Sequence, residues 1–210
     1  MGMRSWLHSP KGRRVLATSV AGLAGLMAIA AISVAAYPYY TDVKAGRQQE
    51  TLRQVFKTDK FAEDFQMGRL VDGSPLTRIK IPSIGADRIV VEGTSLAALN
   101  TGAGHYPGSP MPGQVGNMAI AGHRTMYGGV FRRLADVKPG DKVYLETPFA
   151  KYTYEITMNA QVTDNNNWDI IDEKFSTPML TLTTCHPPGK AAQRLYTRAK
   201  LIDSQTLTGA

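Results

Sequence analysis

Residues 179–202 read MLTLTTCHPPGKAAQRLYTRAKLI, and this stretch decides the fold class. Two runs, residues 179–185 and 194–202, contain apolar side chains that alternate with polar ones, which is typical of half-buried strands. The segment between them, HPPGKAAQ, contains the turn residues proline and glycine. We therefore predict a β-hairpin that brings Arg194 back beside Cys185.

Six further β-type runs precede this hairpin. They are LTRIKIP, RIVVEG, NMAIAG, DKVYLET, KYTYEIT and NAQVT, all between residues 76 and 163. Eight such runs with only short helical segments predict a mainly β domain, either a closed or nearly closed barrel or a sandwich. The Gly/Pro-rich residues 101–117 are expected to form a long loop, and loops of this length in compact domains are usually functional or mobile.

The N-terminal part of the chain predicts a membrane anchor. Residues 15–36 contain no charged residue and would form a helix about 33 Å long at about 1.5 Å per residue, sufficient to cross a bilayer. Only basic charges precede this run, whereas acidic and basic residues balance after it. The positive-inside rule therefore predicts a single-pass protein of the cell membrane, with a cytoplasmic N-terminus and an extracellular globular part.

The sequence thus divides into a basic N-terminus (1–14), a transmembrane anchor (15–36), a juxtamembrane stalk or linker (37–75) and a β-rich domain (76–210). A cleaved secretion signal is the alternative to the anchor, because Val34-Ala35-Ala36 offers residues that a signal peptidase accepts. The stalk could instead form a lid or a partner-binding helix.

Charge argues against nucleic acid as a partner. The whole chain carries +7, but four of its 24 basic residues precede residue 40, so 20 basic residues stand against 17 acidic ones beyond it, a net charge of +3. This excess is too small to indicate a nucleic-acid-binding domain. The basic residues before the anchor suit anionic lipid.

Cys185 is the only cysteine. Extracellular proteins usually pair their cysteines, so a single one indicates a reactive thiol, with a small buried hydrophobe as the alternative. A cysteine nucleophile needs a nearby base, most often histidine. His8 would be cytoplasmic, and His186 would point to the opposite face of the strand from Cys185. His123, at the end of an apolar strand, is favoured over His105 in the Gly/Pro loop.

Arg194 is a candidate for stabilising the oxyanion of an acyl transfer, although an ordinary surface arginine is the alternative. The segment TLTTC, with an arginine nine residues later and NMAIAGHRT upstream, resembles the signature of the sortases, the membrane-anchored cysteine transpeptidases of Gram-positive bacteria. The residues that match are Thr181, Leu182, Thr184, Cys185, Arg194 and His123. The likeness covers residues 76–202, and the blocks GAGHYPGSPMPGQVGNMAIAGHRT and CHPPG are similar to the class E sortases of actinobacteria.

The resemblance implies an eight-stranded sortase-like β-barrel with Cys185, His123 and Arg194 as catalytic residues. It also implies cleavage of a C-terminal LAXTG or LPXTG sorting signal between Thr and Gly, with a thioester intermediate. The acyl group would pass to an amine of a peptidoglycan precursor of the lipid II type. The partners would be secreted proteins that carry the signal.

Four further residues are candidates for binding the sorting signal: Tyr106, Thr183, Thr184 and His105. Ordinary loop packing or strand propensity would also explain them. The acidic residues of DNNNWDIIDEK have no fixed ligand spacing, so neither a metal nor another cofactor is expected.

Two other functions remain open. One is a pilus-polymerising sortase, whose acceptor is a pilin lysine. The other is a non-catalytic extracellular β-barrel that binds a partner and contains an inert cysteine. A papain-like hydrolase is disfavoured because its cysteine precedes its histidine, whereas His123 precedes Cys185 here.

Overall fold

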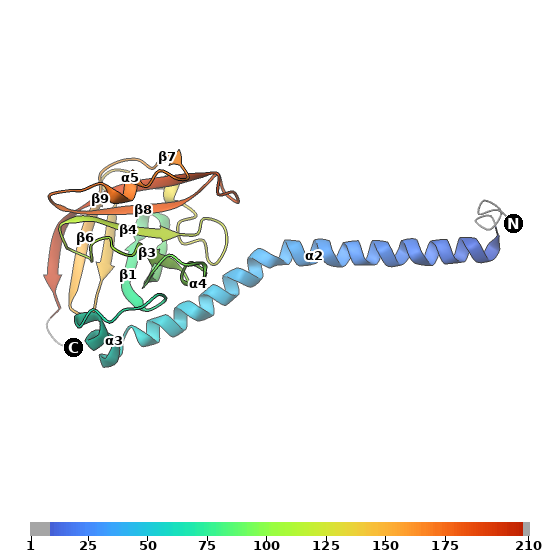
Figure 1. Ribbon diagram of the computed structural model, residues 1–210, viewed down its shortest axis with the longest axis horizontal. Helices are drawn as coiled ribbons and strands as arrows, with labels where there is room; N and C mark the ends of the chain where they lie inside the picture. The colour runs from blue at the N-terminus through green and yellow to red at the C-terminus, as the bar shows by residue number, and fades with distance from the viewer. Residues whose placement is uncertain (1–8, 208–210) are drawn as a thin grey trace. The chain divides into compact units, whose positions relative to one another are not determined.

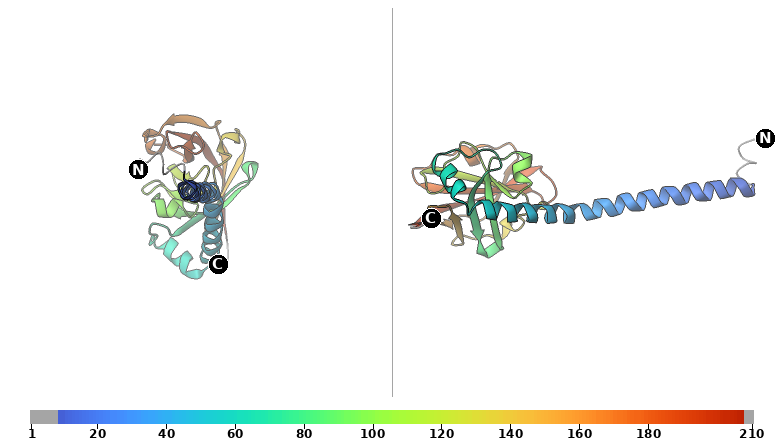
Figure 2. Two further views of the ribbon diagram at one scale, coloured as in Figure 1. Left: turned by 90° about the vertical axis from the view of Figure 1, so that its right-hand side faces the viewer. Right: turned by 90° about the horizontal axis from the view of Figure 1, so that it is seen from below.

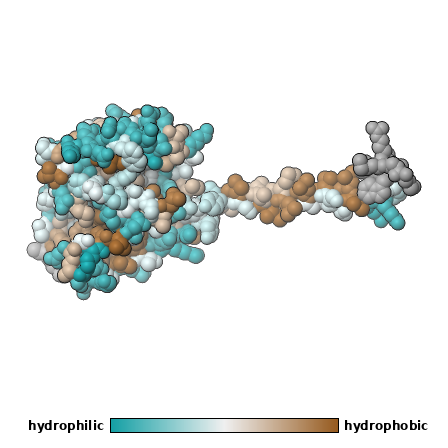
Figure 3. Space-filling view, viewed as in Figure 1, coloured by the Kyte–Doolittle hydropathy of each residue, from teal (hydrophilic) through white to brown (hydrophobic). Residues whose placement is uncertain are grey.

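The computed structural model describes residues 9–207, which form parts of two compact units, residues 1–40 and 41–210. Helix α2 (Pro10–Val55) begins in the first unit. Apolar side chains are exposed along this part of the helix (Figure 3), and its apolar window is not buried by protein. Within the described residues it is the one helix long and apolar enough to cross a membrane. His8 lies outside the described residues.

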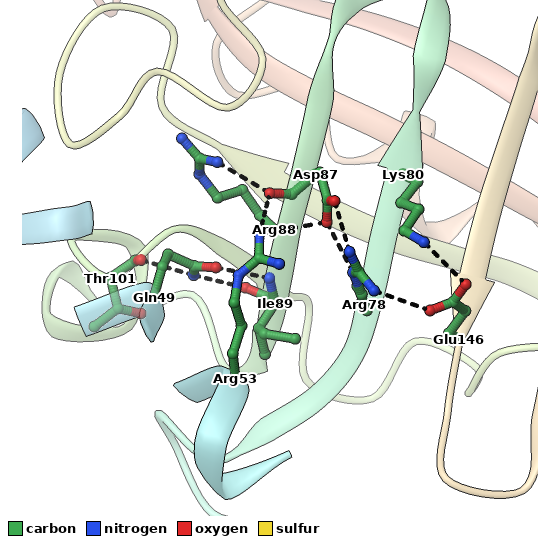
Figure 4. A network of polar contacts seen from close by, with 9 residues as sticks. All are labelled: Gln49, Arg53, Arg78, Lys80, Asp87, Arg88, Ile89, Thr101 and Glu146. Atoms are coloured by element: carbon green, nitrogen blue, oxygen red, sulfur yellow. Dashed lines mark hydrogen bonds and ion pairs between the residues drawn. The ribbon is translucent and has the colours of Figure 1, made fainter. Parts of the chain in front are cut away.

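The second unit includes the last part of α2, residues 41–55. Gln49 is buried, and its Nε2 donates to the carbonyls of Ile89 and Thr101 at 2.9 Å each, while Ile89 N–H donates to Gln49 Oε1 at 2.7 Å (Figure 4). Arg53 Nη2 donates to Asp87 O at 3.0 Å. The compact unit therefore begins well before residue 76, where the sequence suggested its start, because side chains of α2 satisfy backbone groups of a strand.

The described part of this unit contains nine strands: β1 (Pro75–Ile81), β2 (Ala86–Glu92), β3 (Ala103–His105), β4 (Gly116–Gly122), β5 (Lys142–Glu146), β6 (Ala150–Ile156), β7 (Gln161–Asp164), β8 (Pro178–His186) and β9 (Gln193–Thr206). Their order is β6-β5-β1-β2-β3-β4-β8-β9, and pairing of β6 with β9 closes an eight-stranded barrel (Figures 1 and 2). β7 pairs with β9 in addition. The predicted barrel is confirmed.

Short helices precede the first strand or connect later ones. They are α3 (Asp59–Gln66), η1 (Pro82–Ile84), α4 (Leu96–Leu99), η2 (Leu134–Asp136) and α5 (Asp169–Asp172). The core is formed by alternate residues of the strands, such as Ile79, Met118, Ile120, Leu180 and Leu182, which are all fully buried. Since Leu180 and Leu182 point inward, Thr181, Thr183 and Cys185 point to the outer face of β8.

All eight predicted runs form strands, but they are not the eight strands of the barrel. β3 lies inside the predicted Gly/Pro loop, and the NAQVT run became β7, which is outside the ring. β3 has only three residues, and a Cβ on its Gly104 would lie 2.2 Å from Gly93 O. The strand therefore needs a glycine for close backbone approach, and this masks its β character in the sequence.

Candidate active site

Cys185 and Arg194 lie opposite each other on the two strands of the predicted hairpin. β8 and β9 are antiparallel, and the two residues are register partners. Arg194 Nη1 donates a hydrogen bond to Cys185 Sγ at 3.2 Å. The cysteine is free and partly exposed, so a permanent positive charge lies beside an accessible thiol.

His123 follows β4, which runs parallel to β8. Ala121 is the register partner of Thr183, and His123 and Cys185 each follow two residues later on the two neighbouring segments. Register partners share a face of the sheet, and side chains two residues apart point to the same side. The imidazole, the thiol and the Arg194 guanidinium thus belong to one face at one end of the three strands.

Two hydrogen bonds keep the ends of β4 and β8 together on either side of His123. Thr184 is buried, and its Oγ1 donates to the carbonyl of Gly122 at 2.7 Å. Arg124 Nη1 lies 3.4 Å from the carbonyl of Cys185. The residues before and after His123 therefore both contact the strand segment that carries the thiol.

The environment of His123 favours the neutral imidazole. Its ring is half-buried, and this burial lowers the pKa of His123 from its ordinary value. Its Nε2 is buried and, among the described residues, has no hydrogen-bond partner. The ring of Tyr127 lies against it, with 5.1 Å between the ring centroids.

Arg124 and His186 form a second polar pair, in addition to Arg194 and Cys185. Arg124 is 9% exposed, and its Nη1 donates to His186 Nδ1 at 2.8 Å. Because a guanidinium has no acceptor, Nδ1 of His186 must accept, and the imidazole proton lies on Nε2. Arg124 belongs to the NMAIAGHRT motif, and its position directly after His123 is the one signal in the sequence that points to this contact.

A cavity of about 730 Å³ lies between the loop after β3 and the α5 region, and none of Cys185, Arg194 and His123 lines it. One wall is the loop after β3, including Tyr106 and Val115, and the other is the α5 region, including Trp168, Ile171 and Phe175. Tyr106 and Trp168 meet edge to face, with 6.4 Å between ring centroids.

Tyr106 links this cavity to the thiol. Burial raises the pKa of Tyr106, the charge of Arg194 opposes this shift, and the Cys185 side chain adds to it. The phenol is therefore within electrostatic range of both residues, and Tyr106 is the lining residue of the cavity that relates it to the thiol.

His105 supports the loop from beneath and is only 2% exposed. Its Nδ1 lies 2.8 Å from Glu92 Oε2, and its Nε2 lies 2.8 Å from Ser109 Oγ. Ser109 also donates to the carbonyl of Tyr106 at 2.8 Å. The structure thus connects His105 to the loop that carries Tyr106.

Thr183 and Thr184 are both buried and point in opposite directions from β8. The contact of Thr184 with Gly122 is internal to the barrel. Thr183 shares the outer face with Cys185, and its Oγ1 has no hydrogen-bond partner among residues 9–207. Nor does the described part of the chain contain a cluster of three His, Cys, Asp or Glu residues suited to a metal ion.

Comparison with known proteins identifies the family. A family model of the sortase domain matches residues 79–202. The chain belongs to the sortase family. Sortases are cysteine transpeptidases, and the matched range includes Cys185, Arg194 and His123.

Relatives of two sortase classes are similar to the chain. Sortase D of Bacillus subtilis strain 168 is 36% identical over 127 residues, which are 59% of this chain and 62% of that protein. Sortase SrtE1 of Streptomyces coelicolor is 26% identical over 80% of this chain and 51% of its own. The chain therefore spans about half to three-fifths of the length of these relatives. The structure of sortase E from Streptomyces avermitilis has a TM-score of 0.59 and 32% identity, covering 65% of this chain and 93% of that one.

Proposed function

We propose that this chain is a membrane-anchored transpeptidase that cleaves a C-terminal sorting signal between Thr and Gly and transfers the acyl group to an amine. The observation that carries the proposal is the 3.2 Å contact between the Arg194 guanidinium and Cys185 Sγ, on the sheet face to which His123 also belongs. A sulfur nucleophile, a cationic donor and an acid–base group are the three components that acyl transfer through a thioester requires.

In the first half-reaction the Cys185 thiolate attacks the carbonyl carbon of the Thr–Gly bond. A C–S bond forms and the carbonyl oxygen becomes an oxyanion, which Arg194 can stabilise through its charge and N–H groups. His123, as imidazolium, donates its proton to the glycine nitrogen as the C–N bond breaks. The products are a thioester on Cys185, neutral His123 and a free glycine amine.

In the second half-reaction an acceptor amine attacks the thioester carbon. Neutral His123 accepts a proton from the attacking nitrogen, and the C–S bond breaks to return the thiolate. Burial lowers the pKa of His123, which suits this second step because it favours the form that accepts a proton. The first step requires the less favoured imidazolium form.

The 730 Å³ cavity is the proposed binding groove for the sorting signal. Its apolar walls suit the leucine of the signal, and Tyr106 can contribute both a flat ring and a hydroxyl near the thiol. The unpartnered hydroxyl of Thr183 is a further proposed contact. His105 and Thr184 would act through the segments they hold, Tyr106 and Gly122 respectively.

The sequence motifs support class E, an LAXTG signal and a peptidoglycan-precursor amine of the lipid II type as acceptor. A relative named SrtE1 is consistent with that class, but one named Sortase D has the higher identity, 36% against 26%, so the class belongs to the proposal. The basic residues before the apolar run of α2 support a cytoplasmic N-terminus and an extracellular barrel.

The test uses the full chain in detergent with LAXTG and LPXTG peptides, and with triglycine or a lysine-containing pilin peptide as acceptor. Mass spectrometry should detect cleavage between Thr and Gly and a new amide, and Cys185→Ala should abolish both. Val162→Ala, an exposed change on β7, is the control. Cleavage retained by Cys185→Ala would refute the proposal, and preference for the pilin peptide would favour the pilus-polymerising alternative.

A further inference from the structure

The turn that carries His123 has an unusual backbone. Tyr127 has φ 53° and is the one non-glycine residue with positive φ among residues 9–207; Gly128 and Gly129 follow with φ 81° and 46°. An amino acid with a Cβ is strained in this region, and such strain persists only where surrounding contacts hold it. The fold therefore keeps a large aromatic residue where glycine would be easier.

The Tyr127 ring makes a contact that glycine could not. Its centroid is 5.1 Å from that of the His123 imidazole, with 32° between the planes, within the range of favourable aromatic pairs. In many nucleophile–histidine sites a third polar group orients the imidazole. Here His123 Nε2 has no hydrogen-bond partner among the described residues, so the tyrosine ring is the group in position to orient it.

The first residues of the barrel unit hold this turn. Gly128 N–H donates to Asp42 Oδ1 at 2.8 Å, and Arg132 Nη2 donates to Asp42 Oδ2 at 3.3 Å. Thr41 is buried, and its Oγ1 lies 3.5 Å from the Tyr127 nitrogen. The first two residues of the left-handed segment, Tyr127 and Gly128, are thus in contact with α2.

This part of α2 is itself fixed on the barrel. Asp42 and Gln49 are seven residues apart, which is two helical turns, so they lie on the same side of the helix. Ala45, between them on that side, is 2% exposed. The hydrogen bonds from Gln49 to Ile89 and Thr101 anchor the helix to the strands (Figure 4), so the Asp42 carboxylate has a defined place.

We propose that Tyr127 and Asp42 are positioning residues for His123, Tyr127 by packing on the imidazole and Asp42 by holding the turn. The proposal rests on the role of His123 in the proposed function. It makes the segment directly after the predicted membrane span a part of the catalytic apparatus rather than a passive stalk.

The decisive variant is Tyr127→Gly in the full chain in detergent, with the LAXTG peptide and triglycine. Glycine adopts φ 53° without strain, so this change removes the ring without opposing the backbone. We expect kcat to fall about 10-fold with KM within about 2-fold of wild type, because a displaced catalytic group slows chemistry more than binding. Tyr127→Phe retains the ring and should recover most of the activity that Tyr127→Gly loses.

The pH profile provides a readout that a purely structural role would not change. The charged and titratable groups around His123 are Cys185, Arg194, Arg124 and Tyr127, with the paired Asp42 and Arg132 beyond the turn. Removing the ring admits water to the imidazole. The acidic limb of kcat should therefore move to higher pH in Tyr127→Gly, since burial is what lowers the pKa of His123.

Asp42→Ala tests the other half of the proposal and should lower kcat about 3-fold. Asp136→Ala, which removes a comparable exposed partner of Arg133, is its control and should have no effect. Unchanged kcat and pH profile in Tyr127→Gly would overturn the inference; should that variant not fold, unchanged kcat in Asp42→Ala would do so. His123→Ala distinguishes failure of this inference from failure of the proposed function, because activity retained in that variant would refute the proposed function itself.

Discussion

Replacing Arg124 by methionine would test whether the Arg124–His186 pair sets the geometry of the thiol and the imidazole. Arg124 follows His123, and His186 follows Cys185, so this hydrogen bond joins the two chain segments that carry the imidazole and the thiol. Methionine has a similar length and fills the buried volume but donates no hydrogen bond.

The structure sets the expected change in stability. The 2.8 Å hydrogen bond to His186 and the longer one to Cys185 O together contribute about 2–3 kcal/mol, as bonds from a charged donor do. Arg124 Nε is buried without a partner in the described part of the chain, and removing it returns about 1 kcal/mol or more. The net loss should be about 1–2 kcal/mol, or a fall in Tm of about 2–8 °C for a unit of this size.

The expected effect on catalysis is larger. Arg124 Nη1 bridges β4 and β8 across 62 positions of the chain, and without it the imidazole and the sulfur lose a shared support. A displacement of about 1 Å lowers rates by about 10²-fold. We therefore expect kcat for LAXTG cleavage to fall about 10-fold to 10²-fold while the chain remains folded.

Urea denaturation, thermal circular dichroism and peptide cleavage would be measured for Arg124→Met, His186→Ala and the double variant. Arg133→Met, at an exposed arginine, is the control. If the pair acts as a unit, the double variant should be no worse than the more damaging single one, with a coupling of about 1–2 kcal/mol. Additive effects, or activity lost only in proportion to unfolding, would refute the reasoning.

Two further predictions concern the residues beside the thiol. Arg194→Met should lower kcat about 10²-fold or more. Arg194→Lys should lower kcat less, because lysine retains the positive charge although it lacks the forked donors of arginine. Equal rates for the two variants in the peptide assay would contradict this expectation. Burial lowers the pKa of His123 below the ordinary 6.5. The contribution of the buried neutral imidazole to the free energy of unfolding is therefore fully present above about pH 6.5, and it is lost as the pH falls through the lowered pKa. His123→Gln should therefore lose less stability than wild type between about pH 7.5 and pH 5 in urea denaturation, and an identical pH dependence in the two proteins would contradict the burial argument.

The strands and the hairpin could be predicted because their signal is local. Alternation of apolar and polar residues over five to nine positions marks a strand wherever it lies, and every predicted run forms one. β3 lacked this signal, since its Ala-Gly-His is too short for a period and its glycine is set by contact with Gly93. The sequence did not predict that residues 41–55 belong to the barrel unit, for a similar reason. Gln49 is a polar residue that would also suit an exposed stalk, and its partners Ile89 and Thr101 are distant in the sequence.

By itself the sequence determined the class of the fold, a lone cysteine at the end of a strand, and a motif with histidine and arginine at family spacing. The tertiary structure determines the arrangement of these groups: the register pairs Cys185 with Arg194, and the parallel alignment of β4 with β8 runs the segment before His123 alongside the segment before Cys185. It also revealed the supporting contacts of Arg124 and Tyr127. The physical reason is that side-chain periodicity depends on neighbours in the chain, whereas register, ring closure and the partners of buried polar groups depend on residues tens of positions away.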